Sequence, residues 1–113
     1  MARVVIVPSL EEEINKRFKG ESVRVFELLR TLSDNPKKGK ELGHVGRIVV
    51  KELKYGVYRF YFLTDGHSVK FLKADELKNL LVTFVRMSDK DRQAETIEEI
   101  KIVLRKVGDG GFE

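Results

Sequence analysis

The chain has 113 residues, 42% of them hydrophobic and 35% charged, which is typical of one globular domain and excludes a disordered segment. Its lack of cysteine excludes disulfides, thiolate metal sites and a cysteine nucleophile, and two histidines alone do not make a zinc site. The formal net charge is +4, and residues 36–92 hold 13 Lys/Arg against 7 Asp/Glu. This concentration of positive charge favours an anionic partner; a well-solvated surface is the alternative.

Nothing in the sequence indicates a membrane or secreted protein. No apolar run approaches the roughly 20 residues that a membrane-spanning helix needs. Residues 1–8 lack the long apolar segment and cleavage site of a signal peptide. We therefore expect a cytoplasmic protein. One glutamine and three asparagines beside many Lys and Glu favour a thermophilic source.

The first third of the chain predicts a strand followed by two helices. Residues 2–7 are mostly apolar and predict the strand. Ser9 and Glu12 have the spacing of a capping box, which predicts a helix over about 9–19. A second helix is expected over about 22–33, because a proline follows shortly after it.

The middle of the chain predicts an antiparallel sheet. Residues 37–46 are basic and rich in glycine, so we expect a connecting loop. Strands are expected at about 46–54 and 57–64, joined by a tight turn at residues 55–56. Asp-Gly at 65–66 predicts a second hairpin turn.

The last third predicts two more strands and a helix. We expect a short strand at 69–72, a short helical insertion at 74–78 and the last strand at 80–86. A capping-box pattern at 96–99 predicts the final helix, and the tail 108–113 should fray. The whole chain is then a single α+β domain, with helices segregated from a mostly antiparallel sheet.

Five strings, in this order along the chain, resemble a known family: residues 32–42, 52–54, 58–62, 82–88 and 98–104. They resemble the RelE/ParE toxin superfamily, and within it most closely the HigB-like, phage-related branch. The resemblance covers nearly the whole chain except an apparent insertion at about 67–79. It implies a RelE-like fold, in which an N-terminal helical hairpin packs on a mostly antiparallel twisted sheet with a C-terminal helix.

The resemblance also implies a function. Its members include toxin components of type II toxin-antitoxin systems, which cleave mRNA on the ribosome and are held inactive by a cognate antitoxin protein. Such toxins use a basic groove to promote attack of a ribose 2′-hydroxyl on the adjacent phosphate. We therefore expect an RNA-binding endoribonuclease, a hydrolase without cofactor or metal. Two alternatives stay open: a non-catalytic protein of the same fold, such as a gyrase inhibitor, and a nucleic-acid-binding protein of a mobile element or virus.

The aromatic segment around Arg59 is the most informative part of the sequence. Strand alternation places Tyr58, Phe60 and Phe62 on one face, and Arg59 and Tyr61 on the other. Because a guanidinium is costly to bury without a partner, we expect the face with Arg59 to line a groove.

The predicted catalytic residues are Arg59, Lys54, Glu52 and Arg86. Arg59 matches the arginine of the family's Tyr-Arg strand motif, which implies that it binds the scissile phosphate; a salt bridge to Glu52 is the alternative. Lys54 and Glu52 share one strand face, with Leu53 turned to the core. Lys54 is expected to bind phosphate, and Glu52 to orient Arg59, shuttle a proton or simply pair with nearby cations. Arg86 matches a basic position of the family's last strand.

The predicted RNA-binding residues are Arg47, Lys51, Tyr61, Lys90 and Arg92. Arg47 and Lys51 lie on the other phase of their strand, and they face the groove only if the register slips by one residue. Tyr61 either stacks a base or belongs to the core. Lys90 and Arg92 follow the last predicted strand and are expected to bind phosphate.

Some expected features are missing. Several toxins of the superfamily use a tyrosine or histidine near the C-terminus, and no such residue follows Arg92. This difference favours the non-catalytic alternative. His44 and His67 are expected in exposed loops, outside the site.

Overall fold

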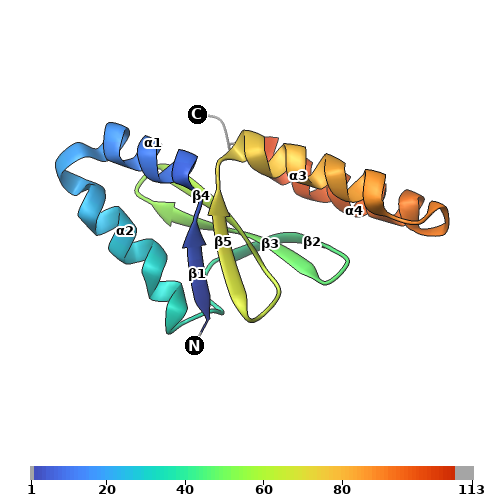
Figure 1. Cartoon of the computed structure of the whole chain (residues 1–113), viewed down its shortest axis with the longest axis horizontal. Helices are drawn as coiled ribbons and strands as arrows, with labels where there is room; N and C mark the ends of the chain where they lie inside the picture. The colour runs from blue at the N-terminus through green and yellow to red at the C-terminus, as the bar shows by residue number, and fades with distance from the viewer. Residues whose placement is uncertain (1, 109–113) are drawn as a thin grey trace.

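The computed structural model describes residues 2–108, and Figure 1 shows a β-sheet with two helices at each end of the chain. Short 3₁₀ turns follow α1 and α2, at Lys19–Glu21 and Thr31–Ser33. Residues 109–113, most of the predicted tail, lie outside the described part. The elements in chain order are β1 Arg3–Ile6, α1 Pro8–Phe18, α2 Ser22–Arg30, β2 Lys40–Val45, β3 Ile48–Tyr55, β4 Tyr58–Thr64, β5 Ser68–Leu72, α3 Ala74–Met87 and α4 Lys90–Gly108.

The sheet has five strands in the order β1-β5-β4-β3-β2. β1 pairs with β5 in parallel, and all the other neighbours are antiparallel. The expected α+β class and mostly antiparallel sheet are therefore confirmed. No helix among residues 2–108 is both long and apolar enough to cross a membrane.

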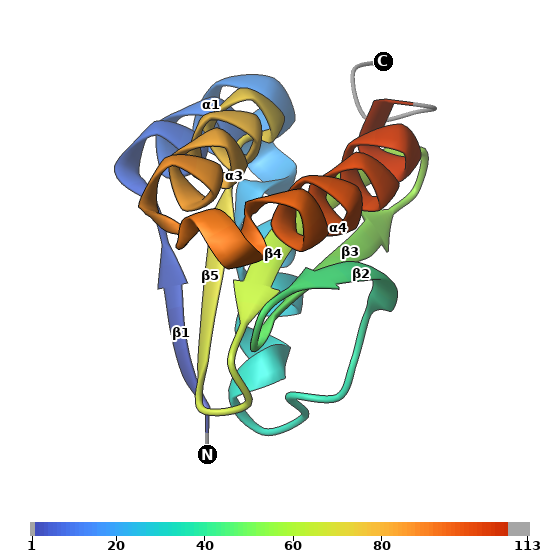
Figure 2. The ribbon, with the colours of Figure 1, turned by 90° about the vertical axis from the view of Figure 1, so that its right-hand side faces the viewer.

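Each face of the sheet carries its own hydrophobic cluster. One cluster joins α1 and α2 to Leu53, Phe60, Phe62 and other strand residues. The second joins α3 and α4 to the opposite side chains of the same strands, among them Val50 and Leu63. Figure 2 shows α3 and α4 on the near side of the sheet and α2 on the far side. The sheet is thus the middle layer of three.

The predicted last strand at 80–86 is wrong, because this segment belongs to α3. Leu77 and Leu81 are fully buried and four residues apart, whereas Asn79, midway between them, is exposed. That spacing is helical rather than alternating. The predicted helical insertion at 74–78 is the first turn of the same helix. Residues 82–85 are β-branched or aromatic, a composition that is typical of strands. The helical spacing of the buried residues nevertheless decides the structure of this segment.

A strand is found where a loop was expected. β2 occupies most of the basic segment 37–46 and forms an edge of the sheet beside β3. Its register is interrupted between Glu41 and Gly43. The expected strands at 46–54, 57–64 and 69–72 are confirmed with small shifts at their ends.

Neither predicted capping box marks a helix start. α1 begins at Pro8, so Ser9 lies inside the helix and donates a hydrogen bond to the Glu76 carboxylate at 2.8 Å. α4 begins at Lys90, so Thr96 also lies inside its helix. The spacing of a capping box also occurs within continuous helices, where tertiary contacts use the polar side chains instead.

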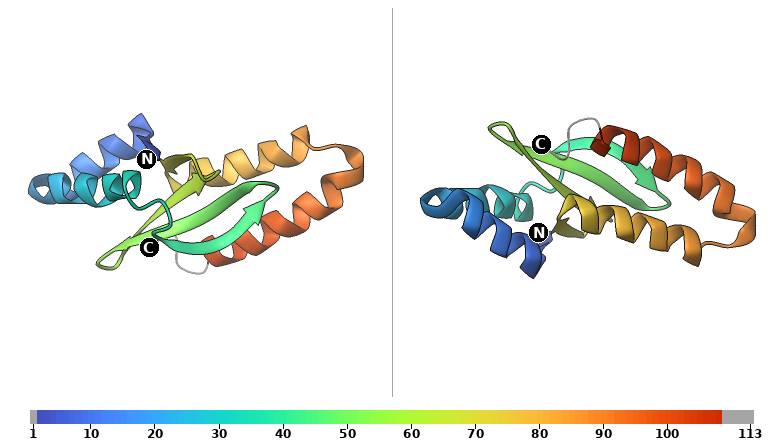
Figure 3. Two further views of the ribbon diagram at one scale, coloured as in Figure 1. Left: turned by 90° about the horizontal axis from the view of Figure 1, so that it is seen from below. Right: turned by 90° about the horizontal axis from the view of Figure 1, so that it is seen from above.

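The molecule is elongated, with extents of 49 × 31 × 22 Å. Figure 3 shows the α3–α4 turn at one end of the long axis and the β3–β4 turn toward the other. Residues near these two turns are therefore far apart, although the sequence predicts both in one site.

Candidate functional site

Glu52, Lys54, Arg59 and Tyr61 lie together on one face of the sheet. β3 and β4 pair so that Lys54 lies opposite Arg59 and Glu52 lies opposite Tyr61. Directly opposed residues of an antiparallel pair carry their side chains on the same face, and Tyr61 belongs to the cluster beneath α3 and α4. The predicted alternation is therefore confirmed for these residues.

Arg59 lies beside a buried carboxylate. Its Nη1 atom is 3.9 Å from Oε2 of Glu52, and the side chain of Glu52 is 3% exposed while that of Arg59 is 34% exposed. Oε2 of Glu52 makes no hydrogen bond within residues 2–108. Because a buried carboxylate needs a compensating charge, the charge of Glu52 favours the position of Arg59 beside it. The alternative role, a salt bridge, is observed, and Glu52 is too buried to shuttle a proton to a substrate.

Lys40 joins this group, although sequence reasoning missed it. It is the first residue of β2, its side chain is exposed, and it pairs directly with Glu52. Lys54 is exposed as well. Lys40, Lys54 and Arg59 therefore form a cationic patch on neighbouring strands around one buried carboxylate. Its positive charge exceeds the negative charge of Glu52, so the patch attracts anions.

Tyr61 is part of the core. Its side chain is 1% exposed, and its hydroxyl makes no hydrogen bond with the described residues. Burial, and then the charge of Glu52, raise the pKa of Tyr61, while the charge of Arg59 opposes this rise. The expectation that Tyr61 stacks a base is wrong, because no base can reach the ring, and the core alternative is confirmed.

Lys51 and Arg47 do not face the cationic patch. Lys51 lies opposite Phe62, whose ring is in the cluster with α1 and α2, and its Nζ donates a hydrogen bond to the Lys37 carbonyl at 3.0 Å. Arg47 is an exposed residue of the β2–β3 turn. The register has not slipped, so the RNA-binding role expected for these two residues under a slip does not apply.

Arg86, Lys90 and Arg92 lie at the other end of the molecule. Arg86 is in the last turn of α3, and Lys90 and Arg92 are in the first turn of α4; all are exposed. Figure 3 places the α3–α4 turn far from the β3–β4 turn that lies next to Arg59. The grouping of Arg86 with Arg59 in a catalytic set is therefore wrong. A strand at 80–86 would have carried Arg86 to the sheet, whereas the helix carries it away.

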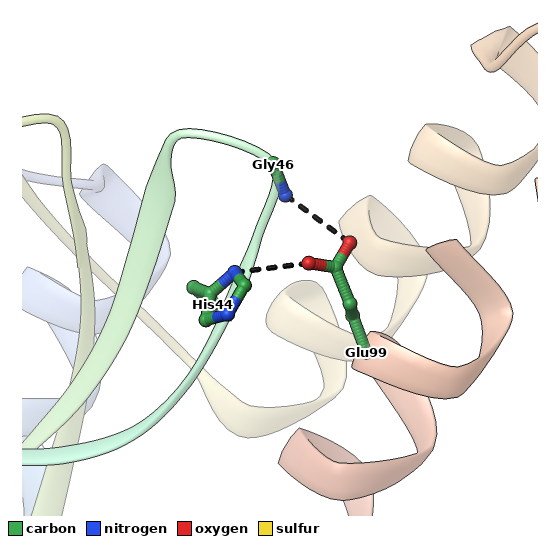
Figure 4. A network of polar contacts seen from close by, with 3 residues as sticks. All are labelled: His44, Gly46 and Glu99. Atoms are coloured by element: carbon green, nitrogen blue, oxygen red, sulfur yellow. Dashed lines mark hydrogen bonds and ion pairs between the residues drawn. The ribbon is translucent and has the colours of Figure 1, made fainter. Parts of the chain in front are cut away.

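His44 has a structural role and lies in β2 rather than a loop. Its Nδ1 is 2.9 Å from Oε2 of Glu99, and the backbone N–H of Gly46 donates to the other oxygen of this carboxylate at 3.3 Å. Figure 4 shows the Glu99 carboxylate between the two groups, so α4 is tied to the β2–β3 turn. His67 is exposed, as expected, in the β4–β5 turn.

The described residues offer no evident site for a metal. Residues 2–108 contain no group of three or more His, Cys, Asp or Glu side chains placed to hold a metal ion. A shallow, mostly apolar pocket of about 180 Å³ lies between the sheet and its β4–β5 turn, away from the cationic patch; its lining is Ile48, Leu63, Thr64, Asp65, Ser68 and Lys70. Ligand pockets are usually larger, about 300–1,000 Å³.

The candidate site is thus a cationic surface around a buried carboxylate. Comparison with known proteins gives no further information about this site. No protein-family model matches the sequence, and no curated protein or solved structure matches it significantly. The resemblance to the RelE/ParE superfamily therefore depends on the sequence strings and their order.

Proposed function

We propose that this protein is a toxin of the RelE/ParE type that binds mRNA on the ribosome through its cationic patch and promotes mRNA cleavage. The observation that carries the proposal is the direct pairing of Lys54 with Arg59 on one sheet face, with Lys40 on the next strand. Cations on rigid strands bind successive phosphates of a nucleic acid backbone. A cognate antitoxin protein is the partner that this class implies.

The division of labour within the patch follows from exposure and charge. Arg59 is partly exposed and presents a planar donor fork that binds a phosphate through two hydrogen bonds. Glu52 orients the Arg59 side chain from beneath. Lys54 lies beside Arg59 and is the group placed to stabilise the charge that develops when a 2′-oxygen bonds to phosphorus and the 5′-oxygen leaves.

A second candidate, RNA binding without cleavage, has a specific observation in its favour. Two members of the predicted site, Glu52 and Tyr61, are buried, and Arg86 lies at the far end of the molecule. Neither histidine of the chain belongs to the patch. The patch therefore contains cations that stabilise charge but no exposed carboxylate or imidazole to exchange protons with the RNA.

The test compares Lys54→Glu with Lys90→Glu, which makes the same change of charge at the other end of the molecule. We expect wild-type protein to arrest growth on expression and to cut mRNA in a cell-free translation reaction only when ribosomes are present. Lys54→Glu should abolish both effects, and Lys90→Glu should retain them. If Lys90→Glu abolished growth arrest and Lys54→Glu retained it, the functional site would lie near the α3–α4 turn, and the proposed site would be wrong.

Binding of single-stranded RNA separates the two candidates. Removing one cation that binds a phosphate should make the dependence of log K on log salt concentration shallower by about 0.7. Lys54→Gln and Lys40→Gln are therefore expected to give shallower salt dependence than wild type. Salt-sensitive binding by wild type without ribosome-dependent cleavage would select the non-catalytic candidate.

A further inference from the structure

The β3–β4 turn carries a second chemical surface, on the face opposite the cationic patch. Tyr55 and Tyr58 lie opposite each other at the ends of the two strands. The ring of Phe18, from the end of α1, packs edge-on against both, with centroid distances of 5.6 and 5.2 Å. Val57, between the strands, is fully exposed. The end of the β3–β4 hairpin is therefore aromatic on this face and exposed to solvent at the turn.

Arg17 covers one of these rings. Its Cζ atom lies 5.0 Å from the centroid of the Tyr58 ring, and its side chain is exposed. A guanidinium over a ring gains from the attraction between the cation and the π-electrons, and the Arg17 side chain remains accessible to solvent. Arginine planes and aromatic rings are the groups on which proteins stack unpaired bases.

The charges around Arg17 are mixed, because Glu13 lies one helical turn before it, and burial and then the charge of Glu13 raise the pKa of Tyr58. Lys16 precedes Arg17 in the last turn of α1, and Lys19 follows that helix. Cations at a helix C-terminus stabilise the helix dipole, and Lys16 and Lys19 serve this purpose as well as Arg17 does. Of these cations, Arg17 is the one stacked on a ring, so the dipole alone does not account for it.

The two surfaces are close enough to bind one strand of RNA. The hairpin is two strands wide at its turn, and neighbouring strands lie about 4.8 Å apart. Lys54 and Arg59 face one side of this ribbon, while Tyr58 faces the other side with Arg17. A flexible backbone that passes the turn reaches both sides within a few nucleotides.

We infer that Arg17 and Tyr58 form a platform on which an unpaired base of RNA stacks while Lys54 and Arg59 hold its neighbouring phosphates. The inference rests on the proposed function and adds the substrate class, single-stranded RNA with accessible bases. A duplex keeps its bases stacked on one another and cannot use the platform.

The experiment measures binding of oligoadenylate and of an abasic ribose-phosphate strand of the same length. Stacking contributes enough that wild type should bind oligoadenylate about 5- to 150-fold more tightly than the abasic strand. Arg17→Lys keeps the charge but removes the plane. We expect this variant to lose most of the preference while its affinity for the abasic strand stays unchanged.

The matched control is Arg30→Lys. Arg30 also covers an aromatic ring, that of Phe26, with Cζ 5.7 Å from the centroid, but both residues belong to α2. This variant removes a comparable interaction elsewhere, and it should keep the full preference for bases. Equal unfolding midpoints for the two variants would show that a change in binding is not a change in folding.

Other outcomes would overturn the inference in different ways. If wild type binds both strands equally and Lys54→Glu weakens binding of both, the platform is wrong and the phosphate patch stands. If Arg17→Lys keeps the preference, the base stacks elsewhere and the platform is wrong. If wild type binds neither strand, the platform is wrong, and ribosome-dependent cleavage of mRNA decides the proposed function separately.

Discussion

The two faces of the sheet are packed by different rules. Toward α1 and α2, the buried residues are apolar except Thr64, whose hydroxyl accepts a hydrogen bond from the Gly66 N–H at 3.1 Å, and the rings of Phe62 and Phe71 lie 4.8 Å apart at their centroids. Toward α3 and α4, the apolar cluster adjoins the carboxylate of Glu52 and includes Tyr61; Oε2 of Glu52 and the Tyr61 hydroxyl are buried and make no hydrogen bond with the described residues.

The two faces therefore differ in what their buried residues contribute: stability on the face toward α1 and α2, and the candidate site on the face toward α3 and α4. An unsatisfied buried polar group costs about 1–3 kcal/mol, so the face toward α3 and α4 is less stable than an apolar face of the same area. The buried Glu52 has a use only in relation to Lys40, Lys54 and Arg59 above it. We therefore regard the face toward α1 and α2 as the structural face, and the other as the face shaped by the site.

The largest predicted effect lies on the structural face. Phe62→Ala should lower the free energy of unfolding by about 3–5 kcal/mol, because it leaves a cavity beside Phe71 that the sheet cannot close. Its neighbour Leu63, on the opposite face beside the shallow pocket, is the matched control. Leu63→Ala should cost about 2 kcal/mol, the low end for its type. Denaturant titrations of both variants measure the difference, and a larger loss for Leu63→Ala would contradict the comparison.

The next largest effect concerns the ion pair. Arg59→Met removes the charge that compensates buried Glu52, and we expect a loss of about 1–3 kcal/mol, nearer the lower value because Arg59 is partly exposed. In the Arg59→Met background, Glu52→Gln should restore part of this loss, since a neutral amide costs less to bury.

A double-mutant cycle measures the coupling between the two side chains. Lys54→Met, which removes an exposed cation of the same patch, serves as control and should change stability little. If Arg59→Met is as harmless as Lys54→Met, Glu52 does not depend on Arg59.

The sheet could be predicted from the sequence where local alternation decides the structure. β4 alternates clearly, so residue spacing predicted which face carries Arg59, whereas the phase of β3 stayed open and the structure shows that Lys54 pairs with Arg59. β2 could not be predicted this way, because its glycine suggested a loop. A Cβ at Gly43 would lie 2.8 Å from Cγ2 of Val103. The glycine is therefore needed for the close approach of α4, a contact that no local pattern reveals.

The same limit explains the errors at the site. Lys40 was missed with β2, and Arg86 was misplaced with α3. Arg17 was missed because its position depends on Phe18 packing against Tyr55 and Tyr58, which are about forty residues away in the sequence. Residue types predicted the anionic partner, but long-range packing decides which cations lie together.

A smaller effect is expected where α4 meets the edge of the sheet. Glu99→Ala removes the acceptor of the Gly46 N–H and the partner of His44, and we expect a loss of about 1 kcal/mol. Glu98→Ala is the control, because its carboxylate pairs with exposed Lys101 in the same helix, and it should be nearly neutral. Thermal unfolding of the two variants tests the contact between α4 and the β2–β3 turn. Equal midpoints would show that Glu99 does not stabilise this contact.

The smallest effect at neutral pH is expected for Tyr61→Phe, which removes a buried hydroxyl that has no hydrogen-bond partner among the described residues. Stability should change by less than about 0.5 kcal/mol or rise slightly, because no hydrogen bond is broken.

At alkaline pH the same substitution should have a clear effect. Burial raises the folded-state pKa of Tyr61 above its ordinary value, while a tyrosine of the unfolded chain ionises with a pKa of about 10. The contribution of Tyr61 is therefore fully present below about pH 10 and is lost as pH rises through the folded-state pKa. Tyr61→Phe should lose less stability than wild type between about pH 9 and pH 11 in denaturant titrations. Parallel losses in the two proteins would mean that Tyr61 is not shielded from solvent, and that both faces of the sheet are packed alike.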